Sequence, residues 1–229
     1  MGQKKYWISG IIGSICFGIG DWLLGFVDPT VPEAKVFYYI RMGHGAQYAG
    51  WKIHVTLILA MVGICFYLPA MKHIADVMKE ERIRGLLGPA FSLCAVGWMV
   101  LHLIVTLNVA FFHETFALAG WETATRISGS TIGYSAFGLY PAMVFIAVPI
   151  CLLSILILLE KTVLRKMAFC FSPLLWMLIW FTAAQELPTS PFSYGLYTYC
   201  MNGAMLVWFL YLLTRKTPTS ALDVPDSET

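Results

Sequence analysis

The chain has 229 residues, of which 59% are hydrophobic and 12% are charged, and its formal net charge is +2. Soluble domains carry about twice that charged fraction, so this composition excludes a soluble globular protein and predicts one that lipid solvates. The basic residues are spread over short polar segments, which argues against a nucleic-acid-binding protein. A single membrane domain is the natural interpretation at this length.

Six apolar stretches are each long enough to cross a bilayer core of about 30 Å, which takes roughly 20 helical residues. In chain order they cover residues 7–27, 53–71, 87–111, 138–159, 167–184 and 196–213. We therefore predict an all-α helix bundle with six transmembrane helices over residues 1–216, with long loops over 28–52 and 113–137. Residues 217–229 are rich in Thr, Ser, Asp and Pro, which predicts a disordered cytoplasmic tail.

The basic residues alternate between the two sides of these six spans. Eleven of the 15 Lys and Arg residues precede the first span or follow the second, fourth and sixth. The other four are Lys35, Arg41, Lys52 and Arg126. By the positive-inside rule, this split predicts that both termini lie in the cytoplasm. The two long loops then lie outside, either as a cap over the bundle or as plain connectors.

Asp21 is the most informative polar residue, because a carboxylate within a membrane span is costly. Gly10, Ser14 and Gly18 form a row of small residues that allows another helix to approach closely. Asp21 lies roughly in line with this row, so we expect its side chain to face protein. Two interpretations remain open: a proton-exchanging or cation-binding carboxylate, or a structural hydrogen bond to a Trp, Tyr or Asn on a neighbouring helix.

The third span carries a second group of polar residues. His102 lies near its middle, Asn108 lies further out, and His113 and Glu114 are at its outer end. The two histidines share a helix face but are about 16 Å apart along the axis, so they could line one cavity without sharing a metal ion. We predict no metal site. His102 could take part in acid–base chemistry or simply be packed, and His113 and Glu114 could be an ordinary hydrated helix end.

Further polar residues lie at a similar outer depth, and together they predict an outward-facing polar pocket in an apolar bundle. The candidates for catalysis are Asp21, His102, Glu114 and Glu186. The candidates for binding are Arg41, His44, Asn108, His113, Asn202 and Trp22. Arg41 and His44 share a face only if their loop is helical.

Residues 18–29, Gly-Ile-Gly-Asp-Trp-Leu-Leu-Gly-Phe-Val-Asp-Pro, resemble the first helix of an uncharacterised bacterial family of multi-pass membrane proteins. The six-helix layout fits this resemblance over residues 1–213. The resemblance implies a bacterial cytoplasmic membrane and draws attention to Gly20 and Asp21. It implies no activity and no catalytic residue.

Three functions are consistent with these features. The first is a pocket that binds a small lipophilic or amphipathic molecule and that could also carry out acid–base chemistry on it. The chemistry requires two titratable groups within hydrogen-bond reach of each other. The second is a transporter or receptor-like module with Asp21 as the coupling or recognition charge. The third is a non-catalytic membrane partner with a filled core. The chain has no phosphate-loop, dinucleotide or zinc-protease motif, so we predict no cofactor. The expected partners are membrane lipid and a small lipophilic ligand, with no nucleic acid, and the oligomeric state stays open.

Overall fold

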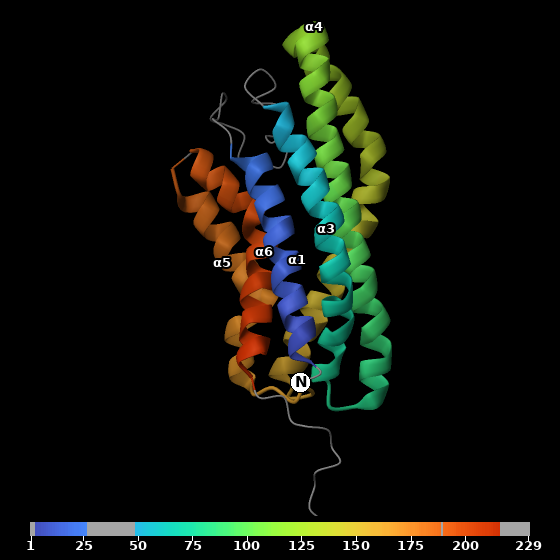
Figure 1. The fold of residues 1–229 in the computed structure, drawn as a ribbon, viewed down its shortest axis with the longest axis vertical. Coiled ribbons are helices and arrows are strands. Elements are labelled where there is room, and N and C mark those ends of the chain that lie inside the picture. Colours follow the sequence, from blue (N-terminus) through green and yellow to red (C-terminus); the bar gives the residue numbers. More distant parts are fainter. Residues whose placement is uncertain (1–2, 27–48, 189, 216–229) are drawn as a thin grey trace, which may run out of the picture.

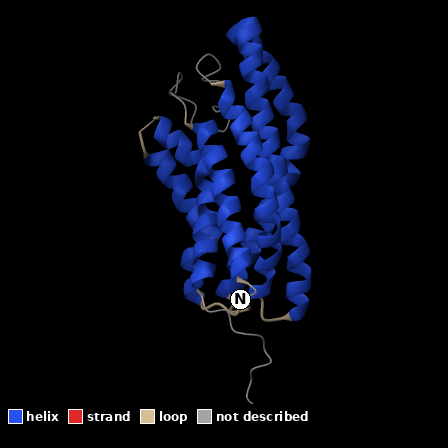
Figure 2. Cartoon of the chain, viewed as in Figure 1, coloured by secondary structure: helices blue, strands red, loops and turns tan. Residues whose placement is uncertain are grey.

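The computed structural model describes residues 3–26, 49–188 and 190–215, which form helices and no β-strand (Figure 1, Figure 2). The α-helices are α1 (Lys4–Gly25), α3 (Gly50–Ile74), α4 (Glu81–Leu158), α5 (Pro173–Glu186) and α6 (Pro191–Thr214). Two short 3₁₀ helices, η1 (Ala75–Val77) and η2 (Lys166–Phe171), lie between them. The predictions for Arg41, His44 and the tail over 217–229 fall outside the described residues.

Five helical stretches of the described chain are long and apolar enough to cross a membrane. They are Lys4–Gly25, Gly50–Val77, Glu81–Ile127, Phe137–Leu158 and Pro191–Thr214. The predicted fifth span, 167–184, is instead divided into η2 and the 14-residue helix α5. The division lies at Ser172, which is extended because it precedes Pro173, and whose side chain caps the new helix by accepting from the Leu175 amide.

α4 is a helical hairpin whose chain direction reverses at Gly120 (Figure 1). Gly120 has φ 77° and ψ 175°, a region of backbone conformation that is nearly restricted to glycine. The two arms run side by side, and the Asn108 side chain donates to Ser135 Oγ at 3.2 Å across them. The prediction of a long loop over 113–137 is therefore wrong, because these residues are helical and extend the two arms of α4. Hydropathy marks where apolar residues stop, whereas a helix ends where its backbone is broken, and here only Gly120 breaks it.

The helices form a curved row with α1 near its centre. α1 packs between α3 and α6, while α4 covers the far side of α3 and α5 covers the far side of α6 (Figure 1). α4 and α5, at the two ends of the row, contact each other only sparsely. Helix packing therefore fills the interior around α1 but leaves space between the α4 hairpin and α5.

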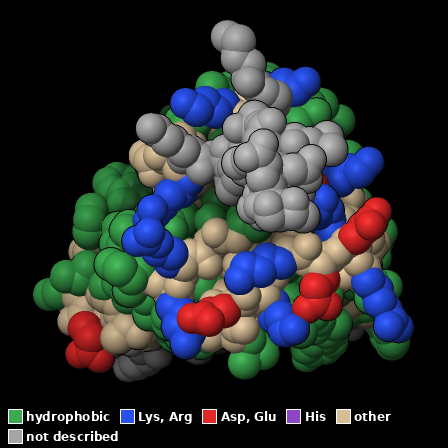
Figure 3. Space-filling view, turned by 90° about the horizontal axis from the view of Figure 1, so that it is seen from below, with side chains coloured by type: hydrophobic (Ala, Val, Ile, Leu, Met, Phe, Trp, Pro, Cys, Tyr) green, Lys and Arg blue, Asp and Glu red, His purple; other side chains and the backbone are tan. Residues whose placement is uncertain are grey.

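Lys and Arg side chains gather at the end of the bundle that holds the N-terminus (Figure 3). At this end α1 begins, α3 and α6 end, and the α4 hairpin begins and ends (Figure 1). Lys161 pairs with Glu80 at 2.7 Å, and Lys166 pairs with Glu160 at 3.2 Å. The basic segments that the charge pattern assigns to one side of the membrane thus meet at one end of the fold.

Candidate functional site

The row of small residues on α1 determines which way Asp21 faces. A Cβ atom on Gly10 would lie 2.6 Å from the ring of Phe209, and one on Gly18 would lie 2.6 Å from the ring of Tyr199. Both rings belong to α6, so the row is the surface on which α6 approaches α1. Asp21 follows Gly18 by one helical turn and consequently faces α6 and the interior.

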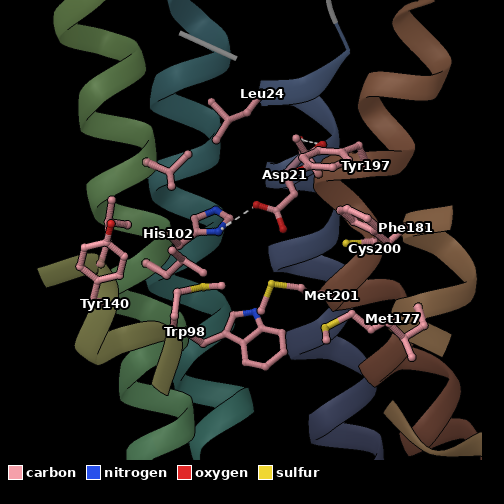
Figure 4. A pocket seen from close by; sticks show the side chains of 16 residues that line it. Asp21, Leu24, Trp98, His102, Tyr140, Met177, Phe181, Tyr197, Cys200 and Met201 are labelled. Atoms are coloured by element: carbon pink, nitrogen blue, oxygen red, sulfur yellow. Dashed lines mark hydrogen bonds and ion pairs between the residues drawn. The ribbon is translucent and has the colours of Figure 1, made fainter. Parts of the chain in front are cut away.

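The Asp21 carboxylate contacts two side chains that come from two other helices. His102 Nδ1 of α4 lies 3.0 Å from Asp21 Oδ1 (Figure 4), and Asn202 Nδ2 of α6 donates to Asp21 Oδ2 at 2.5 Å. Trp98 Nε1 in turn donates to Asn202 Oδ1 at 2.9 Å. The indole can only donate, so it fixes the orientation of the Asn202 amide and directs the NH₂ group at the carboxylate. The result is a continuous polar network across α1, α4 and α6.

Two threonines hold the backbone around Asp21 in place. Thr198 Oγ1 of α6 donates to the Asp21 carbonyl at 2.8 Å, and Thr56 Oγ1 of α3 donates to the Gly20 carbonyl at 3.2 Å. These bonds tie the C-terminal part of α1 to both of its neighbouring helices. Asp21 therefore occupies a defined position, which a site built from three separate helices requires.

His102 is buried. Its side chain is 4% exposed, and the edge of Phe17 lies against it, with ring centroids 5.1 Å apart. Its Nε2 atom has no hydrogen-bond partner among the residues that the structure describes. This atom faces Gly20, where a Cβ would lie 3.1 Å away. The absence of a side chain at Gly20 is therefore what allows the imidazole to approach α1.

A cavity of about 550 Å³ lies beside this network, in the space between the α4 hairpin and α5 (Figure 4). The network contributes Asp21, Trp98 and His102 to its wall. The rest of the wall is mostly apolar and comes from α1, α4, α5 and α6, with Leu24, Leu139, Met143, Met177, Phe181 and Met201 among its members. Its volume lies within the range of small-molecule pockets, roughly 300–1,000 Å³.

The cavity lies in the half of the bundle remote from the basic end. Its α6 residues, 197–201, belong to the first half of a helix that ends at the basic end. Tyr140 of α4 and Phe181 of α5 lie on opposite sides of the Asp21–His102 pair (Figure 4), and they are 72% and 42% exposed. Because these lining residues are also on the lateral surface of the bundle, the cavity is accessible from the side, between α4 and α5.

Comparison with known proteins places the whole bundle in one family. A family model described as a family of unknown function (DUF6796) matches residues 1–216. The chain belongs to this family. No curated protein and no solved structure matches it.

In this DUF6796 chain, three of the predicted site residues come together: Asp21, His102 and Asn202. Asp21 bonds an Asn on a neighbouring helix, as its structural interpretation predicts, and it also lines a cavity beside a histidine. Trp22 lies next to the network but outside the cavity, with its ring packed against Gly195. Asn108 donates to the Ile104 carbonyl within its own arm of α4 and to Ser135 Oγ of the other arm, so its role is structural.

The remaining candidates lie elsewhere. Glu114 is exposed on α4 near the hairpin tip, and Glu186 is exposed at the end of α5; neither lines the cavity. His113 is half-buried and also lies outside the cavity wall. These residues lie in the half of the bundle remote from the basic end, but depth along a helix does not determine which way a side chain points.

Trp98 and Thr198 are site residues that the sequence pattern did not single out. Each precedes a site residue by four positions: Trp98 precedes His102, and Thr198 precedes Asn202. Residues four apart share a helix face, so this spacing could have identified both.

The network can hold and transfer a proton. A carboxylate bonded to Nδ1 of a histidine fixes the ring orientation and stabilises its positive charge if the ring becomes protonated. Because Nε2 faces Gly20, the Asp21 carboxylate, 18% exposed, is the member of the pair that a molecule in the cavity can reach. The described residues contain no cluster of three His, Cys, Asp or Glu side chains suited to a metal ion.

Proposed function

We propose that this chain is a multi-pass protein of a bacterial cytoplasmic membrane whose intramembrane cavity binds a small lipophilic or amphipathic molecule. The observation that carries the proposal is the 550 Å³ cavity, apolar over most of its wall, with the Asp21 carboxylate as its polar anchor. Apolar pockets with a few convergent polar groups are the usual form of small-molecule sites. The bacterial membrane is inferred from the resemblance of residues 18–29.

The lateral opening supports a ligand that dissolves in the bilayer. The residues at the opening, Tyr140 and Phe181, are exposed on a surface that lipid covers in a membrane-spanning bundle. A molecule that partitions into lipid can therefore enter from the side without crossing the polar ends of the bundle. A non-catalytic partner with a filled core is a poorer explanation of this space.

Acid–base chemistry on the bound molecule is a second candidate function. It is favoured by the Asp21–His102 contact of 3.0 Å, which places two titratable groups within hydrogen-bond reach at the cavity wall. Proton exchange would pass through the Asp21 carboxylate, since His102 Nε2 is turned away. A transporter would additionally need access from the basic end, and the cavity lies in the opposite half.

A neutral lipophilic photoprobe tests the binding proposal. Benzophenone dissolves in membranes and, on irradiation, labels nearby C–H groups, and the chain offers an internal comparison among its methionines. Met177 and Met201 line the cavity, whereas Met61 is 59% exposed on the outer surface of α3. We expect saturable labelling of Met177 and Met201, and labelling of Met61 that rises linearly with probe concentration.

The matched variant is Leu101→Trp, which adds bulk to the cavity wall. We expect it to remove the saturable labelling at Met177 and leave the labelling of Met61 unchanged. Linear, unsaturable labelling at all three methionines of the wild-type protein would contradict a binding cavity.

We also propose six membrane crossings with both termini in the cytoplasm, where η2 and α5 together make the fifth. This is supported by the gathering of basic residues at one end of the bundle (Figure 3) and by α5 running beside α6. Reporter fusions test it: an alkaline phosphatase fused after Trp121 should be active, and fusions after Lys79 and Val163 should be inactive. An inactive fusion after Trp121 would contradict the proposed orientation.

A further inference from the structure

The charge of the cavity wall depends on two residues. Among the residues that the structure describes, Asp21 is the one acidic residue that lines the cavity, and no Lys or Arg does. His102 is therefore the only one of these lining residues that could balance the negative charge of the Asp21 carboxylate. Among the described lining residues, the charge of the wall therefore depends on the Asp21–His102 pair alone.

The contacts of His102 satisfy one of its two ring nitrogens. A ring with its proton on Nδ1 donates to Asp21 Oδ1 and has only a lone pair at Nε2. A protonated ring would add an N–H at Nε2, which is buried, lacks a partner among the described residues and faces Gly20. A buried donor without an acceptor is unfavourable. The Asp21 carboxylate is therefore the group of this pair that a ligand in the cavity can reach.

The rest of the wall is suited to a large, soft cation. Four aromatic side chains line it: Trp98, Tyr140, Phe181 and Tyr197. Aromatic rings carry negative charge on their faces and attract organic cations, most strongly where water is excluded. Three methionines also line it, Met143, Met177 and Met201, and their flexible thioethers adapt to ligands of irregular shape.

We infer that the cavity binds lipophilic organic cations, such as amines or quaternary onium ions with apolar substituents, and that the Asp21 carboxylate recognises their charge. This inference rests on the proposed function, since it requires that the cavity binds a lipophilic molecule. The inference adds to the proposed function that the ligand carries a positive charge. A carboxylate held in an apolar wall lacks the solvation that water provides, and a cation that enters the cavity supplies the missing counter-charge.

Two probes of nearly equal size and opposite charge test the inference on the wild-type protein. Tetraphenylphosphonium is a cation and tetraphenylborate is an anion of similar shape, and triphenylmethane provides a neutral comparison. We would measure saturable binding of each by equilibrium dialysis of the detergent-solubilised protein, with protein-free micelles subtracted. We expect the cation to bind at least ten times more tightly than the anion or the neutral compound.

The outcomes separate the inference from the proposed function. Saturable binding of triphenylmethane or tetraphenylborate with an affinity equal to that of the cation would overturn the charge selectivity but leave a lipophilic pocket in place. An absence of saturable binding by all three probes would overturn both. Neither comparison depends on a variant that could fail to fold.

A pair of charge-removing variants then assigns the selectivity to Asp21. Asp21→Asn removes the carboxylate with almost no change of shape, and we expect it to weaken tetraphenylphosphonium binding at least tenfold and triphenylmethane binding less than threefold. Glu122→Gln is the matched control, because Glu122 is exposed near the hairpin tip of α4 and does not line the cavity. Equal losses of cation binding in both variants would show a general effect of charge and overturn the role of Asp21.

Discussion

Asn202 is the residue whose replacement most directly tests the polar network. It is 1% exposed and serves both Trp98, from which it accepts, and Asp21, to which it donates. Asn202→Leu keeps a similar volume but removes both hydrogen bonds. It leaves the Trp98 N–H and one carboxylate oxygen without a protein partner.

The size of the effect follows from these two bonds. A hydrogen bond between helices in a membrane contributes on average about 0.6 kcal/mol and at most about 1.7 kcal/mol. A bond to a charged group lies at the upper end, at about 1.5–3 kcal/mol in soluble proteins. We therefore expect Asn202→Leu to lower the free energy of unfolding by about 2 kcal/mol, as the sum of one neutral and one charge-assisted bond.

The assay is a double-mutant cycle with Trp98→Phe, which removes the indole N–H. Unfolding would be followed by far-ultraviolet circular dichroism during titration with dodecyl sulfate in mixed micelles. In the Trp98→Phe background no indole N–H is left unpaired, so Asn202→Leu should cost about 1 kcal/mol less than in the wild type.

Asn108→Leu is the matched control for this cycle. Asn108 is also a buried asparagine, but it bonds Ile104 and Ser135 within the α4 hairpin. Asn108→Leu should lower the free energy of unfolding by the same amount in the wild type and in the Trp98→Phe background, because Asn108 shares no hydrogen-bond partner with Trp98. An identical cost of Asn202→Leu in both backgrounds would refute the network, since its bonds would then be energetically independent.

Two further predictions compare glycines that have different reasons to be glycine. Gly10→Ala should destabilise the bundle by about 1–3 kcal/mol, because the added Cβ would overlap the Phe209 ring. Gly88→Ala is the control, since open space surrounds its Cβ, and it should be neutral or slightly stabilising in the same titration. Gly120→Ala should lower the free energy of unfolding by about 1–3 kcal/mol, because of its positive φ alone. Gly129→Ala is the control, since Gly129 is helical and its Cβ would also meet open space, and it should not show this loss. Equal melting temperatures for these two variants would contradict the hairpin turn at Gly120.

Local properties of the chain were sufficient to predict the class of fold. Hydropathy identifies apolar stretches without knowledge of their neighbours, and five of the stretches form helices long and apolar enough to cross a membrane. Proline also acts locally, yet its effect at Pro173 was missed, because the apolar stretch over 167–184 continues across the division between η2 and α5. The continuation of both arms of α4 up to Gly120 was missed because these residues resemble a loop in composition.

The importance of Asp21 could be predicted from the sequence, because a carboxylate among apolar residues is costly wherever the helix lies. The small-residue row even indicated that it faces another helix, which is α6. Its partners could not be identified in this way. Membrane helices such as α1 and α6 are apolar on all sides, so no polar face shows how they are rotated against each other.

Only the tertiary structure decided which of the outer polar residues belong together. Asp21, His102 and Asn202 meet because α1 packs between α3 and α6 and the first arm of α4 brings its histidine to the same depth. Glu114 and Glu186 share that half of the molecule but point away from the cavity. The cavity itself exists because α4 and α5 stand at the two ends of a curved row, and this spacing is a property of the packing rather than of any single segment.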